Sequence, residues 1–297
     1  MMIGQEIRRQ KSSLSFEFFP PKDEAGEDRL FGHISKLAEL NPTYVSVTYG
    51  AGGGTRKNTR RVIQRLLKET SLEPMPHLTC VDQNADELKE ILKDYRKLGV
   101  ENILALRGDP PQGQETFIAP ENGYCYARNL VQMASDMRMF SIAVAVYPEG
   151  HPESPSLEKD IEYTKEKIDA GADFGITQMF FNNRHYYEFL ERAVKAHIDI
   201  PLIPGIMPIT DLERTQVFAK RCDATIPNWI IQRFEKAGKD PDEMKKVGVE
   251  VATEQCQDLL AHGVPYLHFY TLNRSEEVTQ VVRNLNFQYP ADRAKHR

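Results

Sequence analysis

The segment SIAVAVYPEGHPESPSLEKDIEYTKEKIDAGADFGITQM, residues 141–179, contains the pattern that decides the fold. It begins with an apolar run at 141–146 and ends with a second one at 174–179. Between them, Ile161, Thr164 and Ile168 recur at helical spacing over 160–170, and Gly171 is a typical helix stop. Runs that are apolar at nearly every position are typical of strands buried on both faces, as in a parallel sheet. The segment therefore predicts one strand–helix–strand unit.

The same unit recurs along all 297 residues. Helical spacing also appears at 27–40 and 86–98, and a gap at 209–263 predicts two amphipathic helices separated by Gly238-Lys239-Asp240-Pro241. Eight units without a composition break predict a single-domain α/β protein, a (β/α)8 TIM barrel with extra helices before the eighth strand. The eight apolar runs are 14–18, 44–48, 75–79, 103–106, 141–146, 174–179, 202–207 and 267–272.

A doubly wound open sheet is the alternative fold. The richest glycine run, at 50–54, fits neither the dinucleotide-binding pattern nor the P-loop, which disfavours that alternative. We expect an N-terminal extension at 1–13, the catalytic barrel at 14–287 and a C-terminal tail at 288–297.

Composition excludes several classes of protein. Hydrophobic residues make up 40% and charged residues 27%, which is typical of a soluble globular chain, and the net charge of -5 gives no reason to expect a nucleic-acid or membrane partner. The four cysteines lack zinc or redox spacing, no compact metal-ligand set appears, and the N-terminus has no apolar signal region. We therefore expect a cytoplasmic protein without a metal site. The basic residues at 56–68 predict a solvated helix face more readily than a phosphate or nucleic-acid patch.

Polar side chains follow most of the predicted strands. In a (β/α)8 barrel the working residues lie at the C-terminal ends of the strands, so these groups are expected to share one mouth, although polarity also returns at strand ends for ordinary reasons. The groups are Glu17, Thr48, His77 with Thr79, Arg107 with Asp109, Tyr147 with His151, Thr177 with Gln178, and Thr271 with Asn273 and Arg274.

Glu17 is the sharpest candidate, because aromatic residues flank it on both sides. A carboxyl group in an apolar pocket has a raised pKa and can act as an acid near neutral pH. An outward-facing strand glutamate remains the alternative. In Arg107-Gly108-Asp109 the glycine permits close backbone approach beside two opposite charges, and a self-paired turn is the alternative there.

Eight motifs occur in the order found in a known family. The chain resembles bacterial methylenetetrahydrofolate reductase from about residue 15 to residue 287. The motifs are FEFFPP (16–21), VTYGA (47–51), PHLTC (76–80), LRGD (106–109), YPEGHP (147–152), ITQMFF (176–181), IPGIMP (203–208) and HFYTLNR (268–274).

The resemblance implies a flavoenzyme of one-carbon metabolism. Such an enzyme is an FAD-containing barrel that reduces 5,10-methylenetetrahydrofolate to 5-methyltetrahydrofolate for methionine biosynthesis. NAD(P)H gives a hydride to non-covalent FAD and leaves before folate binds, which is a ping-pong cycle. The resemblance favours NADH as donor and a homo-oligomer as the assembly. Longer relatives carry a regulatory domain that binds S-adenosylmethionine; it is not expected here.

The resemblance also assigns roles to residues. Glu17 would be the general acid that protonates a ring nitrogen of the folate, and Asp109 would tune the flavin and help bind folate. Thr48 and Gln178 would contact substrate, Phe218 would stack on it, and Arg274 would meet its glutamate tail. The cofactor contacts would be Thr48, His77, Arg107, Gly108, Asp109, Tyr147, His151, Asp160 and Lys167.

Two positions depart from the family pattern. Tyr163 and Glu166 stand where an Asn and an Arg face the FAD. A carboxylate beside a diphosphate replaces attraction with repulsion. Lys167 and another basic residue would therefore have to cover that charge, or FAD would bind less tightly.

Two other function classes remain open. A barrel glycoside hydrolase would pair Glu17 with Asp109 or Glu149 and would need no flavin. A non-catalytic subunit of a one-carbon complex would not need an acid in an apolar pocket.

Overall fold

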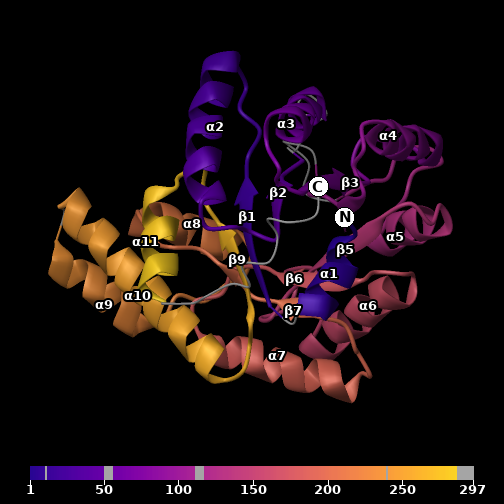
Figure 1. Ribbon diagram of the computed structural model, residues 1–297. Helices are drawn as coiled ribbons and strands as arrows, with labels where there is room; N and C mark the ends of the chain where they lie inside the picture. The colour runs from indigo at the N-terminus through magenta and orange to yellow at the C-terminus, as the bar shows by residue number, and fades with distance from the viewer. Residues whose placement is uncertain (11, 50–55, 111–116, 239, 286–297) are drawn as a thin grey trace.

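A computed structural model of the chain describes residues 1–10, 12–49, 56–110, 117–238 and 240–285. Its strands form a barrel that helices surround (Figure 1). The strands are β1 (Ser13–Phe18), β2 (Tyr44–Val47), β3 (Pro74–Thr79), β4 (Asn102–Leu106), β5 (Ser141–Val146), β6 (Phe174–Thr177), β7 (Leu202–Ile203), β8 (Gly205–Ile206) and β9 (Tyr266–Tyr270). The helices are α1 (Ile3–Gln10), α2 (Glu24–Ala38), α3 (Arg56–Glu69), α4 (Ala85–Lys97), α5 (Ala127–Asp136), α6 (Leu157–Asp169), α7 (Asn183–Lys195), α8 (Leu212–Arg221), α9 (Asn228–Ala237), α10 (Pro241–Ala261) and α11 (Glu276–Asn284).

The strand order confirms the predicted barrel. The strands run β7-β6-β5-β4-β3-β2-β1-β9-β8, and the pairings are parallel. β7 and β8 are two halves of the predicted seventh strand on either side of Pro204, which has no N–H to give to a ladder. The Pro204 carbonyl still accepts a hydrogen bond from the backbone N–H of His268 at 3.0 Å. The sheet therefore closes on itself, and an open doubly wound sheet is excluded.

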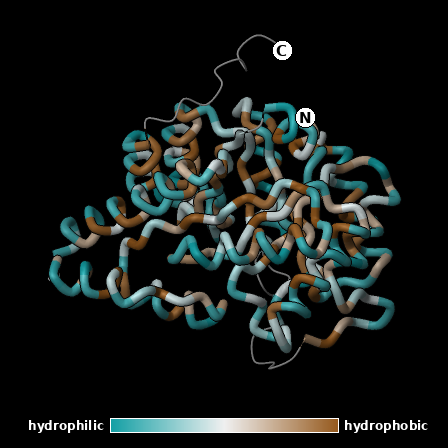
Figure 2. The backbone as a smooth tube through the Cα atoms, turned by 90° about the horizontal axis from the view of Figure 1, so that it is seen from below, coloured by the Kyte–Doolittle hydropathy of each residue, from teal (hydrophilic) through white to brown (hydrophobic). Residues whose placement is uncertain are grey.

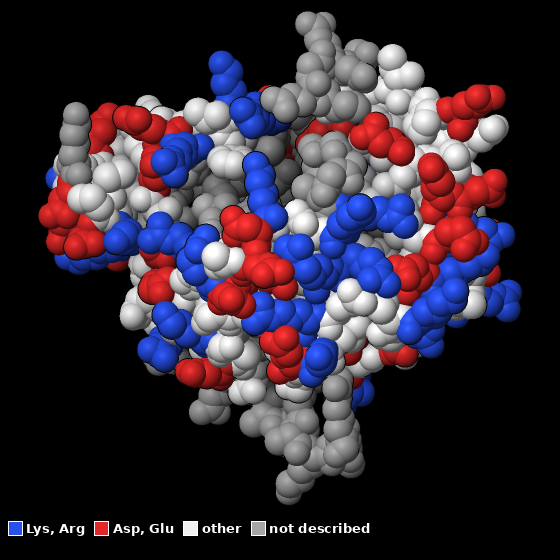
Figure 3. Space-filling view, turned by 90° about the horizontal axis from the view of Figure 1, so that it is seen from above, with Lys and Arg blue, Asp and Glu red and all other residues white. Residues whose placement is uncertain are grey.

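The outer helices cover the barrel with one face each. In Figure 2 hydrophilic and hydrophobic residues alternate along these helices, as expected for amphipathic segments that pack on a sheet. In α4, for example, Leu88, Ile91, Leu92 and Tyr95 are buried at helical spacing, and Asn84 caps the N-terminus in a capping box with Glu87. Three arginines of α3 are paired: Arg60 contacts Asp94, Arg61 contacts Glu27, and Arg65 contacts both Asp28 and Glu69. Figure 3 likewise shows positive and negative side chains interspersed over the face seen from above.

The first helix, α1, closes the end of the barrel at which the strands begin. Ile3 and Ile7 of α1 are fully buried and join a cluster with Tyr44, Met75 and Phe174. These partners lie at or near the N-terminal ends of their strands, so α1 closes the end opposite the predicted site. The sequence predicted only an extension at 1–13. The division into 1–13, 14–287 and 288–297 stays a prediction, and residues 50–55 and 286–297 lie outside the described part of the chain.

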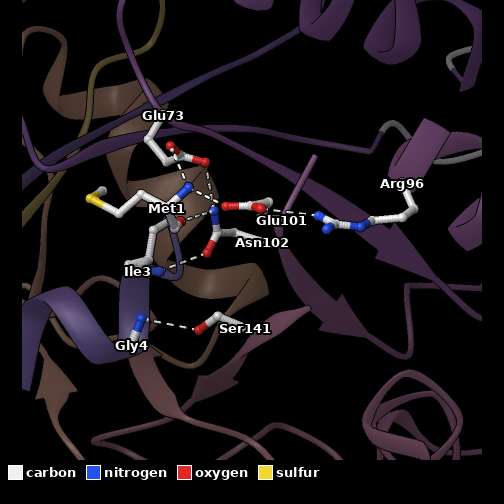
Figure 4. Close-up of polar contacts among 8 residues, drawn as sticks. All are labelled: Met1, Ile3, Gly4, Glu73, Arg96, Glu101, Asn102 and Ser141. Atoms are coloured by element: carbon white, nitrogen blue, oxygen red, sulfur yellow. Dashed lines mark hydrogen bonds and ion pairs between the residues drawn. The ribbon is translucent and has the colours of Figure 1, made fainter. Parts of the chain in front are cut away.

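Side chains of the strands satisfy the first turn of α1 (Figure 4). The N–H of Ile3 donates to Asn102 Oδ1 at 2.7 Å, and the N–H of Gly4 donates to Ser141 Oγ at 3.0 Å. Asn102 Nδ2 donates to the Met1 carbonyl at 2.8 Å, and the Met1 ammonium group pairs with Glu73 at 3.2 Å. Because the first N–H groups of a helix have no partner within it, these contacts fix where α1 begins.

The segment before the last strand differs from the expectation. It holds α8, α9 and α10, not two helices. Helix α8 ends at Arg221, with Cys222 as its C-cap. Pro227 is the N-cap of α9, because proline fits the start of a helix but not its interior. The Gly238–Pro241 junction does separate the last two helices, as predicted. Within the described residues, no helix is both long enough and apolar enough to cross a membrane.

Candidate functional site

A cavity of about 380 Å³ lies at the C-terminal ends of the strands, where the sequence placed the site. We call it the inner cavity. It brings together most of the predicted site residues, which come from separate β/α units. Among its lining residues are Glu17, Thr48, His77, Arg107, Gly108, Asp109, Tyr147, His151, Gln178 and Phe218.

A second cavity, also of about 380 Å³, adjoins the first between α5 and α6. We call it the outer cavity. It shares Arg107, Tyr147 and His151 with the inner one and adds the predicted residues Asp160 and Lys167. The two cavities therefore lie next to each other at the C-terminal ends of the strands.

Glu17 lies on the wall of the inner cavity, between two imidazoles. Its side chain is 9% exposed, and Oε2 is 3.4 Å from His77 Nε2 and 3.5 Å from His268 Nε2. Burial raises the pKa of Glu17, but the charge of His77 and the hydrogen bond of His268 outweigh it and lower the pKa to about 2. The expected raised pKa of Glu17 is therefore wrong, because the flanking aromatics indicated burial, whereas the pairing of Glu17 with His77 and His268 cannot be seen in the sequence. The outward-facing alternative is wrong as well.

Three contacts fix the ring of His268. Its Nδ1 lies 2.8 Å from Ser15 Oγ, it stacks on Tyr44 with centroids 6.1 Å apart, and Tyr270 meets it edge-on at 5.3 Å. A role for His268 and Ser15 at the site was not predicted, because both residues lie inside strands and not at strand ends. The available signal was polar residues at every second position, Ser15 with Glu17 and His268 with Tyr270, which places each pair on one face of its strand.

In the described part of the chain Arg107 and Asp109 form no ion pair with each other, although Arg107 Nε donates to the Gly108 carbonyl within the turn at 3.1 Å. Arg107 Nη2 donates to Glu153 Oε1 at 2.7 Å, whereas Asp109 lies exposed at the inner cavity. Gly108 has φ of 89°, and a Cβ there would lie 2.6 Å from a methyl group of Val81. Only glycine fits this close approach, so the backbone itself forms part of the cavity wall.

The shared wall of the two cavities carries a hydrogen-bonded set. Tyr147 meets His151 edge-on with centroids 4.7 Å apart. Asp160 Oδ1 accepts from the N–H of His151 at 3.1 Å and from Ser154 Oγ at 2.7 Å. Lys167 Nζ donates to the Ala145 carbonyl at 2.6 Å. Burial lowers the pKa of Lys167 to about 8, although the Asp160 carboxylate opposes the shift.

The far wall comes from α8, which carries Phe218. Phe218 is 45% exposed, so a flat ligand has an aromatic face to contact. The loop after α8 is anchored by Glu149, whose two carboxylate oxygens accept from the N–H of Thr225 at 3.1 and 3.0 Å. His185 Nε2 lies 3.5 Å from the same carboxylate.

Some predicted polar residues serve the scaffold. Thr177 Oγ1 accepts from the N–H of Gly205 at 2.8 Å, and Thr271 Oγ1 donates to the Glu17 carbonyl at 2.6 Å. Arg274 is not among the cavity-lining residues; its Nη2 donates to Glu277 Oε1 at 2.6 Å. A role for Arg274 at the glutamate tail stays a prediction.

The donor set fits an elongated ligand with a flat head and an anionic section. The inner cavity offers an aromatic face and a buried acid, and the outer cavity offers the cations Arg107 and Lys167. Gly108 lets such a ligand approach the backbone closely. Within the described ranges, no group of three or more His, Cys, Asp or Glu side chains is arranged to hold a metal ion.

Comparison with known proteins gives a consistent result. A family model described as "Methylenetetrahydrofolate reductase" matches residues 2–286. The 5,10-methylenetetrahydrofolate reductase of Pectobacterium carotovorum subsp. carotovorum is 42% identical over 266 residues, 89% of this chain and 87% of that protein. "Methylenetetrahydrofolate reductase (NADH) 1" of Arabidopsis thaliana is 36% identical over 95% of this chain and 50% of that protein. A solved Clostridium thermocellum protein, described as binding two copies of 5-methyl-5,6,7,8-tetrahydrofolic acid, shares the fold with a TM-score of 0.61 at 14% identity, covering 96% of this chain and 98% of that one.

Proposed function

The chain belongs to the methylenetetrahydrofolate reductase family, and we propose that it reduces 5,10-methylenetetrahydrofolate to 5-methyltetrahydrofolate with NADH through non-covalent FAD. One observation carries the proposal: a buried carboxyl group between two imidazoles faces a cavity, and a second cavity that shares Arg107, Tyr147 and His151 with it is lined by further cations. The name of the plant relative, which specifies NADH, supports NADH as the donor. The reaction places the protein in one-carbon metabolism, on the route to methionine.

The proposed cofactor contacts fall into two sets, one in each cavity. The inner cavity would hold the flavin ring against Thr48, His77 and Tyr147, with Asp109 close to it. The outer cavity would hold the anionic section with Arg107, His151 and Lys167, while Asp160 orients the His151 backbone. Bound there, FAD supplies hydride transfer between nicotinamide and folate, and the protein supplies orientation and electrostatics.

Substrate and nicotinamide would use the same inner cavity in turn, as a ping-pong cycle requires. Gln178 and Thr48 offer polar contacts to a heterocycle, and Phe218 offers a stacking face. Asp109 is exposed at the cavity and can accept hydrogen bonds from a pterin. Arg274 would meet the glutamate tail outside the cavity.

Glu17 would deliver the proton that opens the five-membered folate ring. Because its pKa is about 2, Glu17 is ionised at neutral pH and must first take up a proton to act as an acid. The Nε2 atoms of His77 and His268 lie 3.4 and 3.5 Å from Oε2. Bound folate would exclude water and disfavour the carboxylate, which raises the pKa of Glu17 toward the value that a general acid needs.

The visible absorption spectrum of the purified chain tests the proposal. We expect a flavin spectrum that NADH bleaches under anaerobic conditions and methylenetetrahydrofolate restores, and an FAD that acid or heat releases intact. A covalent flavin or FMN would contradict the cofactor assignment. A colourless protein would favour the hydrolase, although Glu149, one of its candidate carboxylates, is already held by Thr225 and His185.

We also propose that residues 14–287 act as the catalytic barrel, flanked by segments 1–13 and 288–297, and that the chain works in the cytoplasm as a homo-oligomer. Light scattering on the purified protein tests the oligomer, and variants truncated after residue 287 test the boundary.

A further inference from the structure

The outer cavity contains a carboxylate where the family pattern has a cation. Glu166 of α6 lines this cavity together with Tyr163, the second departure from that pattern. An unpaired carboxylate at this place would repel the anionic section of any dinucleotide. The structure supplies a partner: Nη1 of Arg128 forms an ion pair with Glu166 Oε2.

Arg128 reaches Glu166 from the opposite wall. It comes from α5, whereas Glu166 comes from α6, and both line the outer cavity. The guanidinium lies 5.0 Å from the centroid of Tyr126, which is 56% exposed and lines the same cavity. The cation is therefore held over the cavity by a carboxylate on one side and an aromatic ring on the other.

The other charged side chains of the outer cavity also have partners. Arg107 pairs with Glu153, and Lys167 lies close to Asp160 and donates to a backbone carbonyl. Removing Arg128 would leave three carboxylates against two cations in this cavity. Both members of the Arg128–Glu166 pair are about two-fifths exposed, so the guanidinium can turn toward a ligand at low cost.

We propose that Arg128 replaces, from α5, the cation that is missing at position 166, and that the Arg128–Glu166 pair sets the affinity of the outer cavity for the adenosine diphosphate part of FAD. This inference rests on the proposed function. Arg128 supplies the positive charge for the diphosphate, and Glu166 fixes its place. Affinity then depends on the pair: loss of Arg128 exposes Glu166 to the ligand, whereas loss of Glu166 leaves the cation in place.

Charge variants of the two residues, with FAD affinity as the readout, test the pair. The apoprotein of each variant is titrated with FAD, and the dissociation constant is read from flavin fluorescence, without turnover. We expect Arg128→Ser to weaken FAD binding by about tenfold or more and Glu166→Gln to change it by less than about threefold. The double variant Arg128→Ser with Glu166→Arg moves the cation to the other wall and should recover most of the loss.

Three comparisons make the result specific. FMN lacks the adenylate part of FAD, so its affinity should be the same in all variants. Arg184→Ser removes an exposed Arg–Glu pair on α7, outside both cavities, and should leave FAD binding unchanged. Arg128→Lys keeps the charge and should lose less affinity than Arg128→Ser. Circular dichroism and the thermal midpoint confirm that each variant is folded.

The possible outcomes separate this inference from the proposed function. If the unmodified chain binds FAD and Arg128→Ser binds it equally well, the inference is overturned and the proposed function stands. If the double variant binds FAD as weakly as Arg128→Ser does, Arg128 does not act through its charge in the outer cavity, and the inference is again overturned. If the unmodified chain binds no FAD, both fail.

Discussion

Glu17 is held as a carboxylate by His77 and His268, and this pairing links its chemistry to stability. The pKa of Glu17 in the folded chain is about 2, below the value of about 4.3 for a free glutamate. A lowered pKa stabilises the fold at pH values above the unfolded pKa, and this stabilisation is lost as the pH falls from about 4.3 toward 2. At neutral pH the pairing is fully present, and it must be broken for Glu17 to carry a proton.

Glu17→Gln should separate the two half-reactions of the proposed ping-pong cycle. Flavin reduction by NADH requires no protein acid, so its rate should change little. Folate reduction requires ring opening by a proton, and general acid catalysis contributes about 10²- to 10⁴-fold, so this rate should fall by at least that factor. Anaerobic stopped-flow measurement of each half-reaction checks the prediction.

Glutamine retains the shape of Glu17 and one acceptor, so folate binding should survive better than the rate. An equal slowing of both half-reactions would mean that Glu17 has a structural role and that the acid lies elsewhere. His268→Gln is the informative companion, because it removes one imidazole beside Oε2 without touching Glu17 itself.

Lys167 should make FAD affinity depend on pH. Its pKa of about 8 in the ligand-free chain means that the ammonium is mostly charged at pH 7 and mostly neutral at pH 9. A diphosphate prefers the charged form, so FAD affinity should be level below pH 8 and fall by up to about tenfold for each pH unit above it. Titrations of the apoprotein with FAD between pH 6.5 and 9 measure this dependence.

Lys167→Arg provides the matched control, since arginine stays charged throughout this range. Its affinity for FAD should be level from pH 6.5 to 9. Lys167→Met should bind weakly at every pH in the range. A fall above pH 8 that persists in both variants would assign the titration to another group.

At the scale of elements, the strands were predictable and the first helix was not. Apolar runs gave every strand to within a few residues, because burial on both faces of a parallel barrel favours apolar side chains at most strand positions. α1 has two buried isoleucines in eight residues, and its partners Asn102 and Ser141 are far away in sequence. His268 and Arg128 could not be predicted for the same reason: their partners, Ser15 and Glu166, belong to other β/α units and are distant in sequence.

Glu149 should control the placement of α8. Its carboxylate holds the N–H of Thr225 and lies next to His185, and this fixes the connection between α8 and α9. Glu149→Ala removes the acceptor of an exposed backbone N–H, which water can then solvate, so the cost is only about 0.5–1.5 kcal/mol, but α8 and Phe218 should become more mobile. We expect faster amide hydrogen exchange over residues 222–227 and a raised KM for folate.

Glu149→Gln separates the two contacts. The glutamine can still accept from Thr225 but loses the charge beside His185, so exchange over 222–227 should change much less than in Glu149→Ala. Glu158→Ala on α6 is a control in which an exposed carboxylate is removed. Unchanged exchange in Glu149→Ala would show that the connection is held by its other contacts.

On the scale of the whole molecule, closure of the barrel depends on the divided seventh strand. β7 pairs with β6 and β8 pairs with β9, so the ring is joined across Pro204. Tyr270 of β9 crosses this seam and donates from its hydroxyl to the Thr177 carbonyl of β6 at 2.6 Å. The seam lies beside the inner cavity, which Tyr270 also lines, so closure and site geometry share one side chain.

Gly205→Ala should therefore weaken the whole barrel. A Cβ at this position would lie 2.5 Å from the Thr177 carbonyl oxygen and 2.6 Å from the Tyr270 ring, and backbone on one side leaves little room to relax. We expect a loss of about 3 kcal/mol in the free energy of unfolding, measured by urea denaturation, together with weaker FAD binding. Gly32→Ala is the matched control: nothing lies within 4 Å of its Cβ in α2, so the helix should gain about 0.5–1 kcal/mol. If the two substitutions change the free energy of unfolding equally, the seam tolerates a methyl group at Gly205, and the contact with Tyr270 does not limit closure of the barrel.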